Sequence, residues 1–359
     1  MPLVWLVDEA SASAGPDGFL AELGGRLRDV GLPIAGGALT MAVPHPLIAR
    51  RTFLWRGDSG AVIEALGFAP GGLGLAEAAE SPDDAGRRWL ADLAAGPVHE
   101  DVVGARPDAP SLAWVGPRPF RPDEANALRQ AARFAAAPLA AIAARATLAA
   151  LLESYLGRRS AARVQAGALR RGSGETIRAA LLYADLRGFT AMSEATEPAS
   201  VIAALDAWFD RIAGAVHAFG GEVLKFIGDG VLAIFPVASG PADACEAALR
   251  AVTAARAGMA HLDAAREREG LPPLPFGAAL HLGEILWGNI GAADRLDFTA
   301  IGSAVNLVSR LEGLCRPLGR SVLISGAVAA EITAPLVPLG EHAMRGIAAP
   351  CAVFTLPDA

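Results

Sequence analysis

Residues 220–236 read GGEVLKFIGDGVLAIFP, which is two apolar runs on either side of a Gly-Asp-Gly turn. Apolar runs of this length that contain β-branched and aromatic residues are typical of strands, and a glycine-containing turn between two of them is typical of a β-hairpin. We therefore predict strands over 222–227 and 231–235. The turn between them places Asp229 at the tip of the hairpin.

A second carboxylate precedes this hairpin. Residues 179–185 (AALLYAD) form an apolar run, typical of a buried strand, that ends in Asp185. If the two strands are neighbours, Asp185 and Asp229 reach one point. Two carboxylates beside substrate phosphates usually hold a divalent metal ion in phosphoryl transfer. Either aspartate alone would be read as a turn residue, whereas the pair favours a metal site.

The segment between the two carboxylates has helical periodicity. Apolar side chains recur over 200–219 at the three- and four-residue intervals of a helix. The expected buried stripe consists of Ile202, Leu205, Phe209, Ile212 and Val216.

The composition limits the classes of protein to consider. The chain has 359 residues, 53% of them hydrophobic, and a net charge of −7. Its most apolar stretch, 134–152, contains Pro138 and Arg145, so we expect an alanine-rich helix packed within protein and no membrane span. The acidic balance argues against nucleic acid as the main partner. Three scattered cysteines and the lack of a secretory start predict a cytoplasmic protein.

The length predicts two domains, and we expect the catalytic one to begin near residue 176. Residues 1–135 alternate strand-like and helical segments. A helix is expected over 20–30, another opens after Pro122, and strands are expected at 4–7, 38–43, 52–56 and 111–115. Residues 136–175 form a helical, Arg-rich connector. It is either solvated or it couples an input domain to an output domain.

The segment SLAWV (111–115), with its turn and the following helix, resembles the closing part of a GAF-type sensory domain. The alternating pattern would also fit a PAS-like module. Residues 1–135 are thus expected to sense an unknown regulatory ligand or partner. The signal would act through the helix over 125–156 and the connector.

The second half resembles the catalytic domain of the class III nucleotidyl cyclases, the adenylate and guanylate cyclase family. The resemblance covers about residues 176–359 and implies an α/β (α+β) domain of the ferredoxin-like βαββαβ type, preceded by the GAF- or PAS-like mixed α/β domain. Its blocks are ADLRGFT (184–190), GGEVLKFIGDGVLAIFP (220–236), ALHLGEILWGNIG (279–291), DRLDFTAIGSAVNLVSRLE (294–312) and GEHAMRGI (340–347).

Seven residues match positions that act on the nucleotide or on its metal ions in that family. The implied roles are metal binding for Asp185 and Asp229, purine binding for Lys225 and Thr299, transition-state stabilisation for Asn306 and Arg310, and triphosphate binding for Arg345. The family also implies two divalent cations (Mg²⁺ or Mn²⁺) per site. Each site would lie at a homodimer interface, with the aspartates from one protomer and the other residues from its partner.

The residue chemistry agrees with these roles. Asn306 and Arg310 are four apart in a segment with helical spacing, so they share one face, and the planar arginine fork pairs two phosphate oxygens. Lys225 lies on an apolar strand, where an unpaired ammonium group is costly, so we expect it to have a functional partner.

The choice of purine follows from hydrogen bonding. Lys225 can donate to N1 of adenine, and the Thr299 hydroxyl can accept from its amino group. Guanine presents the opposite pattern and calls for an acidic side chain, which guanylate cyclases of this family commonly carry in place of the lysine. We therefore predict an adenylate cyclase with ATP as substrate. A guanylate cyclase and a non-catalytic nucleotide-binding or dimerisation module remain the alternatives.

One position departs from the family pattern. Many members carry a basic residue at the start of the strand that leads to His281, where this chain has Pro275 and Phe276. Triphosphate binding is therefore expected to depend more on Arg345 and on backbone amides.

Overall fold

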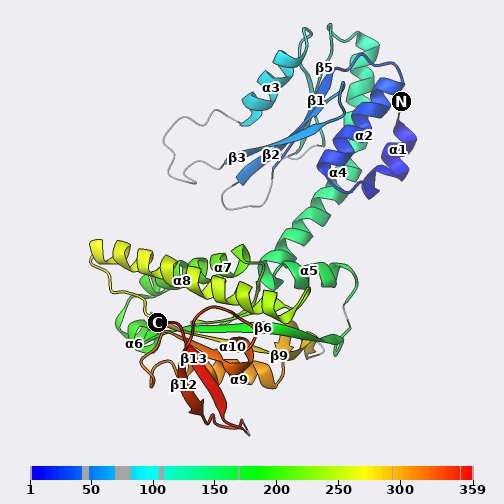
Figure 1. The fold of residues 1–359 in the computed structure, drawn as a ribbon. Coiled ribbons are helices and arrows are strands. Elements are labelled where there is room, and N and C mark those ends of the chain that lie inside the picture. Colours follow the sequence, from blue (N-terminus) through cyan, green and yellow to red (C-terminus); the bar gives the residue numbers. More distant parts are fainter. Residues whose placement is uncertain are drawn as a thin grey trace. The chain divides into compact units, whose positions relative to one another are not determined.

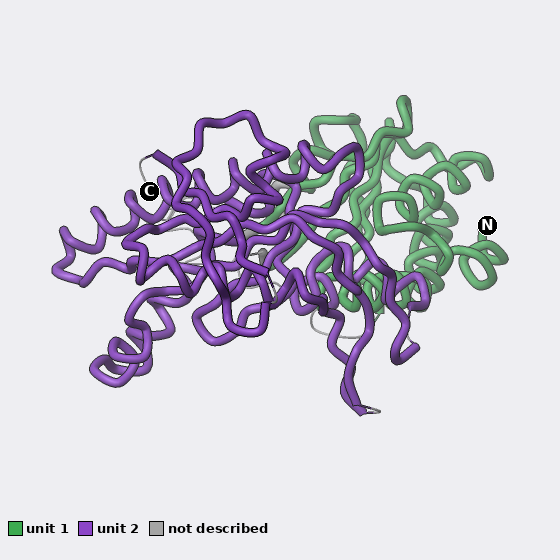
Figure 2. The backbone as a smooth tube through the Cα atoms, turned by 60° about the horizontal axis from the view of Figure 1, so that its bottom comes forward, with its two compact units in different colours: residues 1–151 green, residues 152–359 purple. Residues whose placement is uncertain are grey.

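The computed structural model describes residues 2–42, 48–68, 82–104, 109–168, 170–292, 294–347 and 349–357. The chain separates into two compact units, unit 1 (residues 1–151) and unit 2 (residues 152–359), as Figures 1 and 2 show. Each unit has its own sheet and its own hydrophobic core.

Unit 1 is an antiparallel sheet, in the order β3-β2-β1-β5-β4, with helices on both faces. Helices α2 and α4 pack on the face that presents Leu39 and Trp114, and α3 packs on the other. The elements are α1 (Leu3–Asp8), the 3₁₀-helix η1 (Ala10–Ala12), α2 (Pro16–Asp29), β1 (Gly36–Ala42), β2 (Ile48–Arg56), β3 (Val62–Phe68), α3 (Pro82–Leu93), β4 (His99–Val102), β5 (Ser111–Val115) and α4 (Pro122–Leu156).

The expected strand at 4–7 is wrong, because these residues belong to helix α1. Trp5 and Leu6 are buried while Val4 and Val7 are exposed, which is helical spacing and not the alternation of a strand. A run of four apolar residues does not distinguish the two by itself.

The other segments expected in the first half agree with the structure. Residues 38–42, 52–56 and 111–115 lie in β1, β2 and β5, and the helix expected over 20–30 is α2. Residue 43, the last of the strand expected at 38–43, lies outside the described residues.

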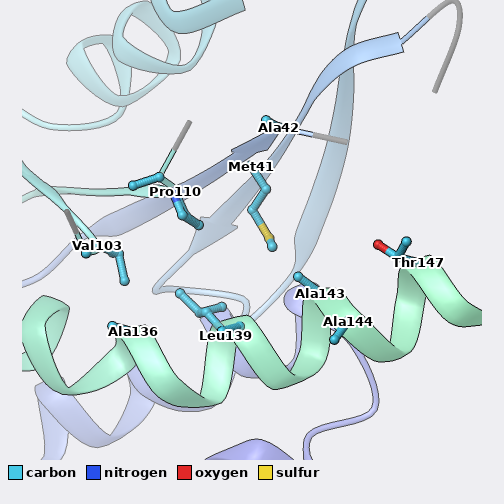
Figure 3. A pocket seen from close by; sticks show the side chains of 12 residues that line it. Met41, Ala42, Val103, Pro110, Ala136, Leu139, Ala143, Ala144 and Thr147 are labelled. Atoms are coloured by element: carbon cyan, nitrogen blue, oxygen red, sulfur yellow. The ribbon is translucent and has the colours of Figure 1, made fainter. Parts of the chain in front are cut away.

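Unit 1 contains a cavity of about 480 Å³ between α4 and one end of the sheet. Figure 3 shows the side chain of Met41 pointing from β1 toward Leu139 and Ala143 of α4. Nearly all the lining side chains are apolar, and Thr147 supplies the one side-chain hydroxyl among the described lining residues. The volume is within the range of small-molecule pockets.

Helix α4 has the alanine-rich composition expected for residues 134–152. By length and composition it could cross a membrane, and it is the one described helix of which this is true. Its first half is buried in the core of unit 1 through residues such as Leu128, Ala135 and Ile142. The absence of a membrane span stays a prediction.

Unit 2 contains a ferredoxin-like core. The strands of the βαββαβ order β6-α7-β7-β8-α8-β9 are arranged β9-β6-β8-β7, and all their pairings are antiparallel. Helices α7 and α8 cover one face, and α9 covers the other. The elements are α5 (Arg158–Gln165), β6 (Gly174–Leu186), α6 (Phe189–Ala195), α7 (Pro198–Ala218), β7 (Glu222–Ile227), β8 (Gly230–Pro236), α8 (Pro241–Arg268), β9 (Phe276–Gly291), β10 (Leu296–Ile301), α9 (Ser303–Glu312), β11 (Val322–Ser325), α10 (Gly326–Ala329), β12 (Val337–His342) and β13 (Cys351–Thr355).

The buried face of α7 matches the expected stripe except at Ile202, and it also includes Trp208. Ile202 is 59% exposed, whereas Trp208 is fully buried and its indole donates to the backbone oxygen of Asp229 at 2.9 Å. The buried positions recur every four residues and include Ala204, Ile212 and Val216. Leu205 and Phe209 of the expected stripe are half-buried and pack against the same core.

The Arg-rich segment packs on the surface of unit 2. Ser160 and Ala161 of α5 are buried, and the carboxylate of Glu222 on β7 accepts from the Ser160 backbone N–H at 3.3 Å. The Arg163 guanidinium lies 5.1 Å from the ring centre of Trp287 on β9. Part of the expected connector is thus attached to the catalytic sheet, and its coupling role stays a prediction.

Candidate active site

Asp185 and Asp229 meet at one end of the unit 2 sheet. Asp185 is the penultimate residue of β6, and Asp229 lies in the turn between β7 and β8. Strand β8 pairs with β6 up to the register position Ala184–Val231, so the strand end and the hairpin turn are adjacent. The two carboxylates lie within hydrogen-bonding range, and burial together with Asp229 raises the pKa of Asp185 to about 7.

This pair fits a divalent cation. The Oδ1 atom of Asp185 is buried and has no hydrogen-bond partner within the described chain. Among the described residues, no cluster of three or more Asp, Glu, His or Cys side chains could hold a metal ion. A hard cation bound by two carboxylates commonly completes its shell with substrate phosphates and water. Asp185 and Asp229 are therefore suited to hold Mg²⁺ or Mn²⁺ together with a nucleotide.

The hairpin turn is fixed by backbone geometry. Gly228 has a φ of +63°, in the left-handed region that glycine adopts without steric cost. The hydrogen bond from Trp208 to the backbone of Asp229 ties the same turn to helix α7. The backbone that carries the Asp229 carboxylate is thus fixed by the glycine turn and by Trp208.

Lys225 of β7 contacts β10, the strand that carries Thr299. The Lys225 ammonium group contacts the carboxylate of Asp297, which lies two residues before Thr299 on β10. Alternate residues of a strand point to the same face, so Asp297 and Thr299 share one side of β10. Thr299 is buried, with 7% exposure. The partner expected for Lys225 is therefore Asp297, which the sequence reasoning missed.

Asn306 and Arg310 lie on the exposed side of α9. Ala304, Val308 and Leu311 are the buried residues of the same helix, so the two polar side chains share the opposite face as expected.

The loop that carries Arg345 lies beside this face of α9. A Cβ atom added to Gly346 would lie 2.8 Å from Nη1 of Arg310, so the turn containing Arg345 and Gly346 contacts the guanidinium. Neither Arg310 nor Arg345 forms an ion pair with any residue that the structure describes. Two guanidinium groups without carboxylate partners are suited to bind a polyanion.

The seven predicted residues thus form three groups within one chain. These are the carboxylate pair, the Lys225–Thr299 pair and the cationic group at α9. Over the described residues, no hydrogen bond or ion pair joins the carboxylates to either of the other groups.

Phe276 belongs to the core and not to the site. It is 8% exposed, and its ring centre lies 5.1 Å from that of Trp208. The start of β9 therefore offers an apolar side chain at the position where the family resemblance implied a basic residue. Arg310 and Arg345, on and beside α9, are two cationic groups that could bind a triphosphate.

Comparison with known proteins identifies the domain that carries this geometry. Residues 173–349 match the family model described as the adenylate and guanylate cyclase catalytic domain. An adenylate cyclase of Anabaena cylindrica is 33% identical over 168 residues, which are 46% of this chain and 32% of that protein. Adenylate cyclase 1 of Rhizobium meliloti is 34% identical over 167 residues, which are 46% of this chain and 25% of that protein. This chain thus spans a quarter to a third of the length of these two relatives.

A solved structure is also similar. The structure of a bacterial light-regulated adenylyl cyclase matches with a TM-score of 0.53 at 20% identity, over 73% of this chain and 86% of that one. At this identity the similarity concerns the fold.

Proposed function

Because residues 173–349 form a class III adenylate and guanylate cyclase catalytic domain, we propose that this chain is an adenylate cyclase. It converts ATP to 3′,5′-cyclic AMP and pyrophosphate by attack of the ribose 3′-hydroxyl on the α-phosphate. The observation that carries the choice of ATP is the pairing of Lys225 with the face of β10 that bears Thr299. Lysine donates to N1 of adenine, and the threonine hydroxyl accepts from the adenine amino group.

Each residue of the site is assigned a separate role in the reaction. Asp185 and Asp229 would hold the divalent cations at the end of the site that receives the ribose 3′-hydroxyl. When bound, Mg²⁺ or Mn²⁺ would supply a lowered pKa at the 3′-hydroxyl and neutralisation of the triphosphate. Arg310 offsets the charge that develops on the α-phosphoryl oxygens, Asn306 orients the ribose, and Arg345 binds the triphosphate. No covalent intermediate on the protein is needed.

We propose further that each site is shared between two chains of a homodimer. In support, no hydrogen bond or ion pair joins the carboxylate pair to Arg310 over the described part of one chain. Large apolar residues are also exposed on the strands that carry Lys225 and Thr299 and on β9, and two of them, Leu286 and Ile301, lie opposite each other in the β9–β10 register. These exposed residues are Phe226 and Ile227 on β7, Leu286 on β9, and Leu296 and Ile301 on β10.

Unit 1 is proposed as the input domain. It has its own core and a largely apolar cavity beside α4, and α4 continues to residue 156, past the boundary between the units. A small-molecule or protein signal at unit 1 would act on the catalytic domain through this helix. The three free cysteines support a cytoplasmic setting for this activity.

Product formation from two nucleotides tests the enzyme proposal. The purified chain is incubated with ATP or GTP in Mg²⁺ or Mn²⁺, and cyclic AMP and cyclic GMP are measured. We expect cyclic AMP from ATP, and we expect Asp185→Ala to abolish it while Asp206→Ala, at an exposed position on α7, does not. Preference for GTP would identify a guanylate cyclase. No product from either nucleotide with a dimeric protein would indicate a non-catalytic module.

Deletion of residues 1–150 tests the input proposal. Unit 2 has its own core, so the remaining chain is expected to fold, which circular dichroism checks. The truncated protein should differ from the full chain in basal rate or in dimer affinity. Equal values for both properties would remove the regulatory role of unit 1.

A further inference from the structure

The catalytic scheme above does not use the carboxylate that contacts the purine-binding lysine. Asp297 is the second residue of β10 and lies opposite Ile290 of β9. Its Oδ2 atom accepts from the Lys225 ammonium group across the gap between β10 and β7. This is the one ion pair that either residue makes with the described part of the chain.

The position of this ion pair suits recognition better than stabilisation of the fold. The Asp297 side chain is 52% exposed and that of Lys225 is 31% exposed, and ion pairs so open to solvent contribute little to folding. Both groups lie on the side of β10 that carries Thr299, which is the other residue proposed to contact the base.

The chemistry of a lysine explains why such a partner is needed. Its ammonium group sits at the end of a flexible four-carbon chain, and a free lysine samples many rotamers. An anchored ammonium group still has hydrogens to donate, because it carries three. Asp297 can therefore fix the orientation of the Lys225 ammonium group and leave one of its N–H groups free to donate to a purine.

We propose that Asp297 is a positioning residue that sets purine selectivity by holding Lys225 for donation to N1 of adenine. The proposal rests on the function proposed above and extends it to a residue that makes no contact with the reacting atoms. It also explains how a carboxylate can lie in an adenine site. Lys225 neutralises Asp297, and without that neutralisation the carboxylate would favour the N1–H donor of guanine.

Substitution of Asp297 tests this role through binding and selectivity. Asp297→Ala should raise KM for ATP about tenfold and leave kcat within about twofold, since the lost charge-assisted contact orders the base and not the phosphates. The preference for ATP over 1-deaza-ATP, which lacks the N1 acceptor, should fall by a similar factor. Asp294→Ala is the matched control, because Asp294 is exposed in the neighbouring β9–β10 connection.

A double variant separates positioning from an independent contact. If Asp297 acts through Lys225, then removal of Asp297 from the Lys225→Ala variant does not lower kcat/KM for ATP further, and the double variant Lys225→Ala/Asp297→Ala is at least as active as Lys225→Ala. An unchanged KM and an unchanged ATP preference in Asp297→Ala would overturn the proposal. So would a double variant much weaker than Lys225→Ala. Thermal unfolding of each variant verifies that the fold is retained.

Binding of α,β-methylene-ATP, measured by calorimetry, distinguishes the failure of this proposal from failure of the proposed function. If the wild-type chain makes no cyclic AMP but binds the analogue about tenfold more tightly than Asp297→Ala does, the enzyme proposal fails and the role of Asp297 stands. Equal affinities, or no binding by the wild type, would remove the role of Asp297.

Discussion

The carboxylates of Asp185 and Asp229 lie within hydrogen-bonding range of each other, although one belongs to a strand end and the other to a hairpin turn. Burial and this neighbour raise the pKa of Asp185 to about 7, and the charge of Glu312 adds to the effect. Two like charges brought together in a partly buried place oppose folding, and such arrangements are typical of functional sites.

Replacement of Asp185 by asparagine should therefore stabilise the metal-free protein at pH 8. The native pKa is above the unfolded value, so the native state binds more protons between about pH 4 and 7, and stability falls as the pH rises through that range. Asparagine carries no charge at any pH. We expect a gain of about 1–2 kcal/mol at pH 8, after allowance for solvent screening, and a smaller gain at pH 5.

Urea unfolding in the presence of EDTA measures this difference. Asp206→Asn, at an exposed position on α7, should change the free energy of unfolding by less than about 0.5 kcal/mol. The asparagine variant at position 185 should make no cyclic AMP. A loss of stability at pH 8 in that variant would contradict the like-charge explanation.

His281 should make the protein sensitive to acid. It is hydrogen-bonded to Ser325 Oγ at 2.9 Å, and burial lowers its pKa to about 4. The unfolded chain takes up a proton near pH 6.5 and the native chain does not, so stability is lost as the pH falls from about 6.5 to 4. The slope is up to about 1.4 kcal/mol per pH unit for one such group.

Unfolding measured at several pH values tests this slope. His281→Gln should flatten the loss of stability between pH 6.5 and 4.5, while His261→Gln, at an exposed position on α8, should keep the wild-type slope. Identical pH profiles for wild type and His281→Gln would rule out this histidine as the cause.

Gly346 should matter for catalysis because its turn touches Arg310. Gly346→Ala places a Cβ atom 2.8 Å from Nη1 of Arg310 and displaces the guanidinium. Gly340→Ala is the matched control, since Gly340 also has a positive φ (+88° against +74°) but open space around its Cβ position. Both variants should lose about 1 kcal/mol of stability, whereas kcat should fall about tenfold or more only in Gly346→Ala.

Steady-state kinetics of the two glycine variants measure the predicted difference in kcat, and thermal unfolding checks that both lose a similar amount of stability. Equal kcat values would show that the turn does not hold Arg310 in its working position.

The local features of the catalytic domain could be predicted from the sequence. The hairpin around Asp229, the strand ending in Asp185 and the shared face of Asn306 and Arg310 all follow from short-range patterns, namely apolar runs, turn residues and four-residue spacing. The approach of Asp185 to Asp229 required one further assumption, that β6 and β8 are neighbours, and the register confirms it.

Features that depend on packing between distant segments could not be predicted in this way. The contact between Lys225 and Asp297 joins β7 to β10, and no pattern within either strand indicates it. On α7, the burial of Trp208 and the exposure of Ile202 depart from the stripe that apolar spacing favoured. The contact of Gly346 with Arg310 likewise appears only in three dimensions.

Mixing two inactive variants tests the shared-site adenylate cyclase most directly. Asp185→Ala and Arg310→Ala should each make no cyclic AMP alone, because every homodimeric site lacks one required group. In an equal mixture that exchanges subunits, half of the dimers are mixed and each has one intact site, so about a quarter of the wild-type activity should return. A mixture that stays inactive, although pull-down of differently tagged chains demonstrates mixed dimers, would contradict the account.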